Sequence, residues 1–352
     1  MSQHVEAVVV AGGFGTRLQP LTTRRPKHLL NVGGVPFLEH QVARLAVAGV
    51  EHIVVATSYH ADLFEPVLGD GARWGVRLEY VQEQNPLGTA GAIRHAASML
   101  RNDPDGPVVI LNGDILSDHD LSAQLADFEK PRSARQVDVS LHLVEVPDAR
   151  AFGCVSTDDS GQVMGFVEKS DTPGSNQVNA GCYVFRRRVI DKIPAGRAVS
   201  VERETFPALI AGGALVVGFL DTSYWRDVGT PAALVAASRD LVLGVAASPA
   251  VASEPSGARV AHGARVSGTA TVNGGSVVAE AALVGEGAVV SGSVLMAGAV
   301  VGAGAVVTDS VVGPGAVVGR GAVLREATVG DEARVGAGAH LDGDRVECGA
   351  EV

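Results

Sequence analysis

The stretch AGGFGTRLQPLTTRRPKHLL, residues 11–30, decides how the first part of this chain folds. It follows a short apolar run, 7–10, which predicts a buried strand. The loop after that strand carries three glycines: Gly12, Gly13 and Gly15. Their backbone N–H groups can surround a phosphate chain, because no side chains stand in the way. With two nearby cations, Arg17 and Lys27, the loop predicts a site for a nucleoside triphosphate.

Two familiar phosphate-binding loops do not match this stretch. The dinucleotide fingerprint needs a third glycine where Leu18 stands, and the P-loop needs a glycine where Arg17 stands. The pattern is instead G-G-x-G-T-R-L-x-P-L-T followed by P-K, which adds Thr16 to the loop. Because this pattern fixes so many positions, we do not interpret it as an ordinary glycine-rich turn.

The composition of the chain excludes several classes of partner. The net charge of −11 and the isoelectric point near 5.4 argue against nucleic acid and against an anionic membrane surface. A site for phosphorylated substrates is therefore expected to be a local basic pocket. The sequence has no cationic start followed by an apolar stretch, and no transmembrane run. Three widely spaced cysteines are interpreted as reduced core thiols of a cytoplasmic protein: Cys154, Cys182 and Cys348.

The residues up to Trp225 alternate between strand and helix patterns. Strand-like runs lie near 5–11, 52–57, 78–82 and 108–112, and helix-like runs near 37–48, 89–100 and 121–129. This alternation predicts an α/β domain with a mostly parallel sheet and helices on both faces. Ligands of such sheets bind at the carboxyl ends of the strands. The glycine loop and Asn112-Gly113-Asp114 both follow strands, so we expect them to converge.

Further strand-like runs extend this sheet into a Rossmann-like mixed sheet: 137–146, 163–168, 178–185 and 215–219. A helix is predicted at 231–243, and 246–257, with its Ala, Ser and Pro, predicts a linker. No Phe, Trp or Tyr follows Trp225, and this shift in composition marks a second architecture. We expect a catalytic domain at 1–245, the linker, and a repeat domain at 258–352.

The repeat domain shows a hexapeptide period. An aliphatic residue recurs in three series: 260–290, 294–324 and 329–341. The register shifts between the first two series, and the first members of the second are Val294, Val300 and Val306. Hexads of this kind are typical of a parallel β-helix, in which three hexads form one triangular coil, so about five coils are expected. The repeat is similar to that of left-handed β-helices, an exception to the right-handed crossover rule.

Six further stretches accompany the glycine loop: PLGTAGAI (86–93), LNGDIL (111–116), RAFGCV (150–155), FVEKS (166–170), VNAGCYVF (178–185) and YWRDVGTP (224–231). Together they resemble the sugar-1-phosphate nucleotidyltransferases, in particular bacterial mannose-1-phosphate guanylyltransferases, over almost the whole chain. The resemblance implies Mg²⁺-assisted in-line transfer: a phosphate oxygen of the sugar 1-phosphate attacks the α-phosphorus, and pyrophosphate leaves. A phosphate monoester has a second pKa near ~6, so this nucleophile needs no general base.

The resemblance also implies a role for each motif residue. The catalytic residues would be Arg17, Lys27, Asp114, Lys169 and Asp227, with Asp114 and Asp227 as the Mg²⁺ ligands. The nucleotide-binding residues would be Gly12, Gly13, Gly15, Thr16, Glu83, Gly88 and Thr89. The sugar-phosphate-binding residues would be Gly153, Glu168, Lys169 and Asn179. Within these sets, Arg17 is expected on the β- and γ-phosphates, Lys27 on the α-phosphate and Lys169 on the sugar phosphate.

Some of these positions allow a second interpretation. Either aspartate, taken alone, could be a turn or cap residue, and Lys169 could be a solvated surface lysine. The family carries prolines where this chain has His28 and Ser170. His119, in an acidic run, is expected in a solvated loop rather than in a metal site.

Glu83 bears on the choice of base. It stands shortly before Gly88, at the position where thymidylyl members of the family carry a Gln that reads thymine. A carboxylate accepts two hydrogen bonds and donates none, and guanine offers two adjacent donors. Glu83 therefore favours GTP over dTTP and UTP. The alternative is that Glu83 is an exposed residue at a strand end.

These observations predict an enzyme that couples GTP and mannose 1-phosphate to GDP-mannose and pyrophosphate. Alternative acceptors are another hexose 1-phosphate or a cyclitol phosphate such as valienol 1-phosphate. A catalytically silent regulatory subunit is a different class of function, which the complete motif set disfavours. An acyltransferase site in the β-helix would need a histidine base, and only His262 and His340 are available. The flat faces and end coil of a β-helix favour self-association, so we expect a homo-oligomer.

Overall fold

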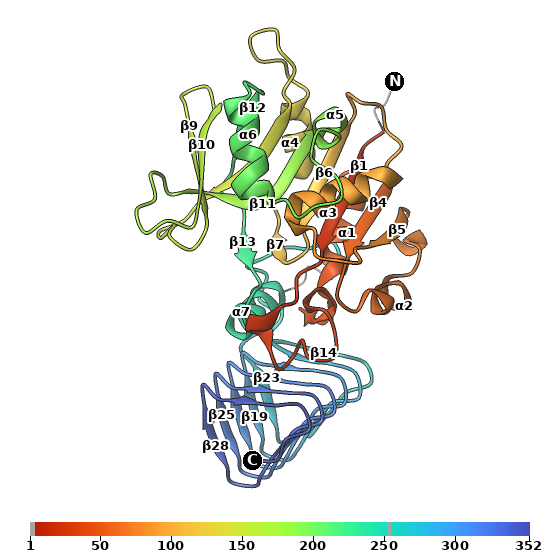
Figure 1. Cartoon of the computed structure of the whole chain (residues 1–352). Helices are drawn as coiled ribbons and strands as arrows, with labels where there is room; N and C mark the ends of the chain where they lie inside the picture. Colours follow the sequence, from red (N-terminus) through yellow and green to blue (C-terminus); the bar gives the residue numbers. More distant parts are fainter. Residues whose placement is uncertain (1–3, 252–254) are drawn as a thin grey trace. The chain divides into compact units, whose positions relative to one another are not determined.

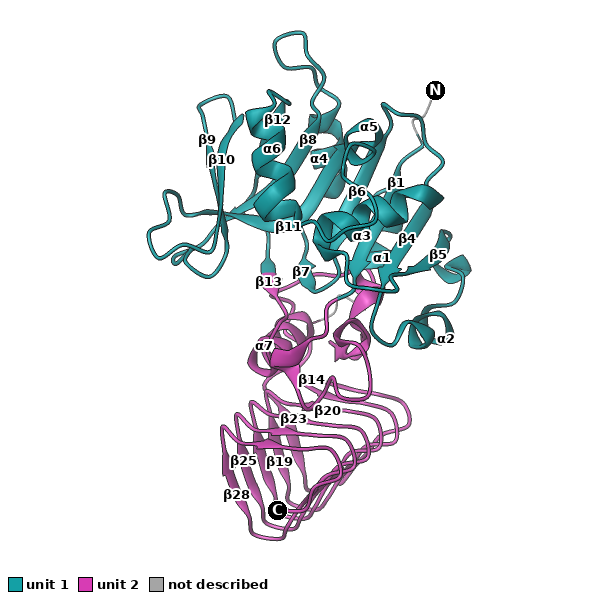
Figure 2. Cartoon of the chain, in the orientation of Figure 1, with its two compact units in different colours: residues 1–12, 41–225 teal, residues 13–40, 226–352 magenta. Residues whose placement is uncertain are grey.

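The structure, a computed structural model, describes residues 4–251 and 255–352, so part of the predicted linker lies outside the described residues. The backbone divides into two compact units, each built from two segments (Figure 2). Unit 1 consists of Met1–Gly12 and Gln41–Trp225, and unit 2 of Gly13–His40 and Arg226–Val352. Most of the glycine-loop stretch therefore groups with the C-terminal repeat. The limits 1–245 and 258–352 stay predictions from the sequence.

Unit 1 is built on a nine-stranded sheet in the order β10-β9-β11-β6-β1-β4-β5, with β8 paired to β11 and β12 paired to β8 (Figure 1). Four strands run parallel: β1 (Glu6–Ala11), β4 (His52–Thr57), β5 (Arg77–Gln82) and β6 (Pro107–Asn112). The other strands are β8 (Val139–Glu145), β9 (Gly153–Thr157), β10 (Val163–Glu168), β11 (Gln177–Arg186) and β12 (Val216–Leu220). Because β11 is antiparallel to β6, β8 and β9, the prediction of a mixed sheet is confirmed.

Helices cover both faces of the sheet, as the alternation predicted. Leu141 and Tyr183 point to one face, where they share a core with Ile93 of α3 (Gly88–Ala96) and with Phe206 of α6 (Phe206–Ala211). Neighbouring strand positions point the other way, so Ser140 accepts a hydrogen bond from Gln124 of α4 (Leu121–Phe128). The remaining elements of this unit include α2 (Phe64–Leu68), α5 (Arg187–Ile190), β7 (Ile115–Ser117), the 3-10 turns η3 (Ala61–Leu63), η4 (Ala72–Trp74) and η5 (Ala97–Met99), and the π-helical turn η6 (Val201–Thr205).

His119 is buried, so the expectation of a solvated loop is wrong. Its ring stacks on His142 with a centroid distance of 3.8 Å, contacts the Arg44 guanidinium, and lies 3.0 Å from Gln124 Oε1. Burial, and then the charge of Arg44, lower the pKa of His119 to about 2, so the ring stays neutral. The acidic neighbours Asp118 and Asp120 suggested solvent, but the partners that bury the ring come from distant positions.

Unit 2 starts with a compact loop region that contains the 3-10 turns η1 (Thr16–Leu18) and η2 (Lys27–Leu29) and the hairpin β2 (Asn31–Val32) and β3 (Val35–Pro36). The chain passes from one unit to the other after Gly12, within helix α1 (Phe37–Val47) and within strand β13 (Trp225–Asp227). Helix α7 (Pro231–Val242) starts at Thr230, whose hydroxyl accepts the Ala233 N–H at 3.2 Å. This helix packs on β2 and on the first part of the repeat.

The repeat forms a parallel β-helix of stacked triangular coils (Figure 2). Its first sheet contains β14 (Ala258–Val260), β17 (Ser276–Val278), β20 (Val294–Leu295), β23 (Val311–Val312), β26 (Thr328–Val329) and β29 (Arg345–Val346). The second contains β15 (Arg265–Val266), β18 (Leu283–Val284), β21 (Val300–Val301), β24 (Val317–Val318) and β27 (Arg334–Val335). The third contains β16 (Thr271–Asn273), β19 (Val289–Ser291), β22 (Val306–Thr308), β25 (Val323–Arg325) and β28 (His340–Asp342). Five complete coils, consistent with a left-handed β-helix, confirm the prediction.

The register of the second hexad series was predicted wrongly for its first three members only, because Val312, Val318 and Leu324 lie in the prism as predicted. Val294, Val300 and Val306 were expected in the prism, but the core residues are Leu295, Val301 and Val307, the next position along in each case. Val278 pairs with Leu295, so this coil is slightly shorter than three full hexads would make it. The shortening occurs at the corner near Gly292, which takes φ 56°, whereas the preceding coil uses Gly274 and Gly275 there. Paired valines at 300–301 and 306–307 hid the shift in the sequence.

This corrected register predicts different costs for two adjacent valines. Val301→Ala should lower the free energy of unfolding by about 1–3 kcal/mol, because it opens a cavity in a packed prism. Val300→Ala, outside the prism, should cost less than about 1 kcal/mol. Urea unfolding of the full chain, followed by circular dichroism, measures both. If Val300→Ala lowered the free energy of unfolding more than Val301→Ala did, the register expected from the sequence would be right instead.

Two further features complete the fold. In the described part of the chain, no helix has the length and apolarity that crossing a membrane requires. Cys154 and Cys182 are buried as expected, but Cys348 is partly exposed, so it is not a core thiol.

Candidate active site

The glycine loop of unit 2 folds tightly around Lys27. Gly15 adopts the left-handed conformation (φ 65°), and its carbonyl accepts the Thr22 hydroxyl at 2.9 Å. A Cβ on Gly13 would lie 3.2 Å from Lys27 Nζ, and a Cβ on Gly15 would lie 3.0 Å from Lys27 Cβ. The lysine side chain therefore runs along the loop, and side chains at these two positions would displace it.

Arg17 and Asp227 lie beside each other in the same unit. Arg17 Nη2 is 3.8 Å from Asp227 Oδ2, and the two side chains are 67% and 30% exposed. A Cβ on Gly229 would collide with the Arg17 guanidinium, so the glycine of the W-R-D-V-G-T motif leaves room for this cation. Unit 2 thus brings together two cations, an exposed loop residue, Thr16, and one of the two predicted metal ligands.

The base-reading candidate lies in unit 1. Glu83, which follows β5, is only 8% exposed, so the alternative of an exposed strand-end residue is wrong. Its Oε2 accepts the Leu87 N–H at 3.1 Å and would lie 3.9 Å from a Cβ on Gly12. Burial raises the pKa of Glu83, while the Leu87 hydrogen bond and the charge of His95 lower it. The carboxylate therefore faces the start of the glycine loop.

The next two nucleotide-binding candidates begin helix α3. Gly88 has φ 68°, and a Cβ there would lie 2.6 Å from the Val199 carbonyl oxygen, so only glycine fits. The Thr89 hydroxyl donates to Glu202 Oε2 and accepts the Val201 N–H, both at 2.8 Å. These contacts join α3 to η6, and through them the Thr89 hydroxyl already donates and accepts a hydrogen bond within unit 1.

Asp114 occupies the turn between β6 and β7 and is half-buried. The preceding residue, Gly113, donates its N–H to the Val10 carbonyl at 2.9 Å, which ties this turn to β1. Because β1 and β6 are parallel neighbours, Gly12 and Asp114 both follow the carboxyl ends of adjacent strands. This edge of an α/β sheet is where ligands bind.

The sugar-phosphate candidates Gly153, Glu168 and Lys169 meet on the hairpin β9–β10. Glu168 pairs with Gly153, and a Cβ on Gly153 would lie 2.8 Å from Glu168 Oε2. Lys169 takes φ 47°, and its Nζ lies 3.8 Å from Glu168 Oε1. Burial first, then the charge of Glu202, raises the pKa of Glu168, and Lys169 lowers it. Gly153 therefore makes room for the partly buried Glu168 carboxylate, which lies beside the exposed Lys169 amine.

Asn179 belongs to a polar network whose other members the sequence did not single out. Its Nδ2 donates to the Tyr183 hydroxyl at 2.8 Å, and its Oδ1 accepts the Gly181 N–H at 3.1 Å. Gly181 takes φ 74°, and a Cβ there would lie 2.9 Å from Asn112 Nδ2. Burial raises the pKa of Tyr183 well above its ordinary value, so the phenol stays protonated. The N-A-G spacing of this strand was the available signal, because a glycine inside a strand marks a bulge or a close approach.

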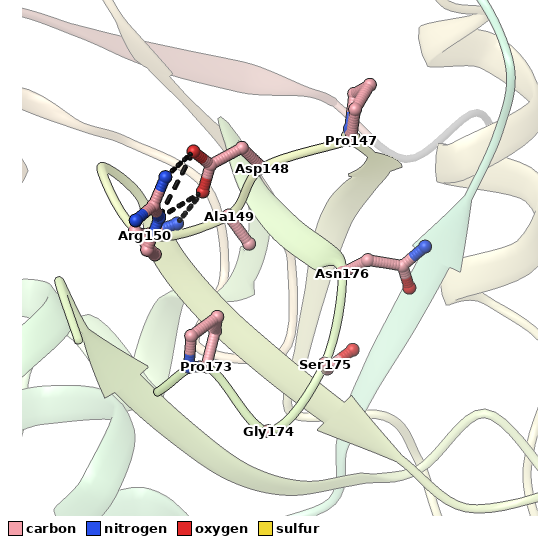
Figure 3. A pocket seen from close by; sticks show the side chains of 8 residues that line it. All are labelled: Pro147, Asp148, Ala149, Arg150, Pro173, Gly174, Ser175 and Asn176. Carbon is pink, nitrogen blue, oxygen red and sulfur yellow. Dashed lines mark hydrogen bonds and ion pairs between the residues drawn. The ribbon is translucent and has the colours of Figure 1, made fainter. Parts of the chain in front are cut away.

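A wide pocket of about 590 Å³ opens between the loops that precede Gly153 and Asn179 (Figure 3). Its lining residues are Pro147, Asp148, Ala149, Arg150, Pro173, Gly174, Ser175 and Asn176. Arg150 Nη2 lies 2.6 Å from Asp148 Oδ2, and this hydrogen bond lowers the pKa of Asp148 to about 2. The pocket is therefore lined by the ion pair Asp148–Arg150 and lies close in sequence to two of the predicted sugar-phosphate-binding residues, Gly153 and Asn179.

The comparisons with known proteins show the family of the chain. The family model described as nucleotidyl transferase matches residues 6–242, and the model described as the GMPPB C-terminal domain matches residues 257–351. The chain belongs to the nucleotidyl transferase family. A mannose-1-phosphate guanylyltransferase of Mycobacterium tuberculosis is 53% identical over 253 residues, which cover 71% of this chain and 68% of that protein. The catalytic subunit beta of the Xenopus tropicalis enzyme is 36% identical over 64% of this chain and 62% of its own length.

A solved structure is also similar to this chain. HddC from Yersinia pseudotuberculosis, crystallised in complex with GMP-PN, matches with a TM-score of 0.56 and 26% identity, over 66% of this chain and 97% of that chain. The chain thus spans about two thirds of the length of its relatives named as mannose-1-phosphate guanylyltransferases, or slightly less.

Nucleotidyltransferases of this kind generally use a divalent metal ion. Each of the two predicted ligands has the chemistry that such an ion needs: Asp114 in unit 1 and Asp227 in unit 2 are both partly exposed carboxylates at the ends of strands. Hard divalent cations prefer carboxylate oxygens, supplemented by phosphate oxygens of the substrate.

Proposed function

We propose that this chain couples GTP and mannose 1-phosphate to GDP-mannose and pyrophosphate. The observation that carries the proposal is the 53% identity to the Mycobacterium tuberculosis mannose-1-phosphate guanylyltransferase, supported by the relatives near 36% identity. The nucleotidyl transferase match over residues 6–242 supports the same reaction class, a sugar-1-phosphate guanylyltransferase.

In this proposal the glycine loop and its two cations act on the triphosphate. The N–H groups of Gly13, Gly15 and Thr16 bind phosphate oxygens, since the glycines leave the backbone open. Lys27 neutralises charge that builds up on the α-phosphate, and Arg17 stabilises the leaving pyrophosphate. A phosphate oxygen of the acceptor forms the new bond to the α-phosphorus, while the bond to the β-phosphate oxygen breaks. The acceptor is already ionised near neutral pH, so no residue has to remove a proton.

The candidates on the nine-stranded sheet bind the base and the acceptor in the same proposal. Lys169 holds the phosphate of the sugar. The Glu168 carboxylate accepts hydrogen bonds from the sugar hydroxyl groups, and the Asn179 amide accepts from them or donates to them. Gly153 contributes its backbone and the space that Glu168 needs. Gly12, Gly88 and Thr89 shape the nucleotide side, although the Thr89 hydroxyl already bonds Glu202.

We further propose Mg²⁺ as the metal, with Asp114 and Asp227 as its protein ligands. When bound, Mg²⁺ supplies charge neutralisation on the phosphates that react. Asp227 also orients Arg17, whose guanidinium lies beside it.

The state of the chain in solution is part of the proposal as well. We expect a cytoplasmic enzyme, since none of the three cysteines forms a disulfide. We also expect a homo-oligomer, because the flat faces of the β-helix and the strand edges of its end coil favour pairing. Light scattering of the full chain at several concentrations tests this: a constant monomer mass contradicts it.

The choice of base gives a sharp test. GTP should exceed dTTP and UTP in kcat/KM, and Glu83→Gln should reduce this preference. A mismatched polar contact in a closed site costs about 1–3 kcal/mol, or roughly 5–150-fold. Steady-state pyrophosphate release with each nucleotide measures the effect.

The matched control for that test is Glu65→Gln, an exposed glutamate on α2. It should leave the order of nucleotides unchanged. A wild-type preference for dTTP, or an unchanged preference in Glu83→Gln, would count against guanine reading by this residue.

A further inference from the structure

The segment that joins Arg17 to Lys27 is fastened to the β-helix by a largely buried ion pair. Arg25 Nη1 donates to Asp331 Oδ1 at 3.1 Å, and Arg25 Nη2 donates to Asp331 Oδ2 at 2.5 Å. The two side chains are 24% and 4% exposed. Bidentate, charge-assisted contacts of this kind fix geometry as well as adding energy. All of these residues belong to unit 2.

Two more contacts hold the start of the same segment. Arg345 Nη1 donates to the Gln19 carbonyl at 3.0 Å, and the Cys348 thiol lies 3.5 Å from the Pro20 carbonyl oxygen. Residues 19–25 therefore lie along the last coils of the β-helix and are held at both ends.

The position of Asp331 within the repeat is unusual. It occupies a corner of its coil, and the equivalent corners of the two preceding coils carry Pro314 and Ala297, whose carbonyls accept the same corner hydrogen bond from the next coil. A carboxylate buried at such a corner is costly unless a cation pairs with it. Nothing in the repeat itself accounts for a charged residue at this corner, whereas the ion pair with Arg25 does.

Arg25 is linked to the phosphate-binding atoms by a short, rigid path. Only Pro26, which is buried, separates it from Lys27. Lys27 packs along Gly15, and Thr22 from the same segment donates to the Gly15 carbonyl. A displacement of residues 19–25 would therefore move Lys27 and the glycine loop together.

We propose that Asp331 is a positioning residue for the nucleotidyl transfer. Through Arg25 it fixes Lys27 and the glycine loop, so that a β-helix residue far along the chain sets the geometry of the phosphate site. The inference rests on the proposed function for its catalytic consequence, but not for its structural one.

The test compares Asp331→Asn, Arg25→Gln and the double variant in the full chain. Each single variant should lower kcat by about 10–100-fold, since small displacements of positioned groups have effects of this size. KM for mannose 1-phosphate should stay within about twofold, because its proposed contacts lie elsewhere. The double variant should be no worse than the worse single variant, since both break one interaction. If Asp331→Asn fails to fold, the partly exposed Arg25→Gln carries the same test.

A neighbouring ion pair provides the control. Arg24 Nη1 lies 3.0 Å from Glu332 Oε2, and both residues are direct neighbours of the buried pair in the sequence, but these side chains are 46% and 65% exposed. Glu332→Gln should keep kcat within about twofold of wild type, since exposed pairs contribute little.

Hydrogen exchange of the substrate-free protein separates positioning from general stability. In Asp331→Asn the amides of residues 15–30 should exchange faster, while those of β17–β25 should not change. The proposal would be overturned if both single variants had the kcat and the exchange rates of the wild type. It would also be overturned if exchange became faster throughout the β-helix. A wild type that is inactive with every substrate contradicts the proposed function, whereas the exchange comparison still decides whether Asp331 holds the loop.

Discussion

Asp114→Asn and Asp227→Asn are each expected to lower kcat by at least ~10²-fold at saturating Mg²⁺. Both carboxylates are partly exposed at strand ends, and both are proposed as ligands of the Mg²⁺ ion. Asparagine keeps the size of the side chain but removes the negative charge that attracts the ion. Steady-state pyrophosphate release should be measured across a range of Mg²⁺ concentrations. Both variants should need a higher Mg²⁺ concentration than the wild type to reach half of their own maximal rate.

The matched control is Asp62→Asn, an exposed aspartate in η3. Its kcat and its Mg²⁺ dependence should equal those of the wild type. Near-normal turnover in either test variant at saturating Mg²⁺ would remove that residue from the metal site.

Lys27→Met is expected to lower kcat by about 10²–10³-fold, the range seen when one preorganised donor is removed from a reacting oxygen. Methionine retains most of the length and packing of the lysine side chain along Gly13 and Gly15, so the loop should keep its conformation. The loss should therefore appear in kcat, with a small change in KM for the nucleotide. Single-turnover kinetics measures the chemical step directly.

Lys130→Met serves as the control, because Lys130 is 67% exposed and pairs only weakly with Asp127. It should behave as the wild type does. A Lys27→Met variant whose main defect lies in nucleotide KM would instead indicate a ground-state contact.

Much of the catalytic fold could be predicted because local patterns and tertiary structure agree. The strand at 52–57 was predicted with both of its ends, since a short run of buried, mostly β-branched residues is typical of a buried strand. The need for glycine at two positions of the predicted nucleotide site has a related reason. Gly15 and Gly88 need positive φ, and the sequence has glycine where only glycine fits.

The errors arose where two patterns overlapped or where partners came from far along the chain. The doublet Val300-Val301 satisfies the hexapeptide period in either register, and only the tight corner at Gly292 decides between them. The burial of His119 depends on Arg44 and His142, which no local window contains. Polarity of neighbours was therefore a poor guide to exposure.

The grouping of the glycine loop with the repeat could not be predicted either. The contact between Arg25 and Asp331 joins positions 306 residues apart, and neither residue belongs to a recognisable motif. Each looks like an ordinary surface charge in the sequence. Only their lower exposure, 24% and 4%, distinguishes them from the exposed pair Arg24 and Glu332.

The most direct test of the central claim is product formation by the full-length chain. Supplied with GTP, Mg²⁺ and mannose 1-phosphate, it should release GDP-mannose and pyrophosphate in equal amounts, as resolved by mass spectrometry. Glucose 1-phosphate and a cyclitol phosphate, offered with the same GTP, should give a lower kcat/KM. A higher kcat/KM with either of these acceptors, or no GDP-mannose at all, would contradict the account.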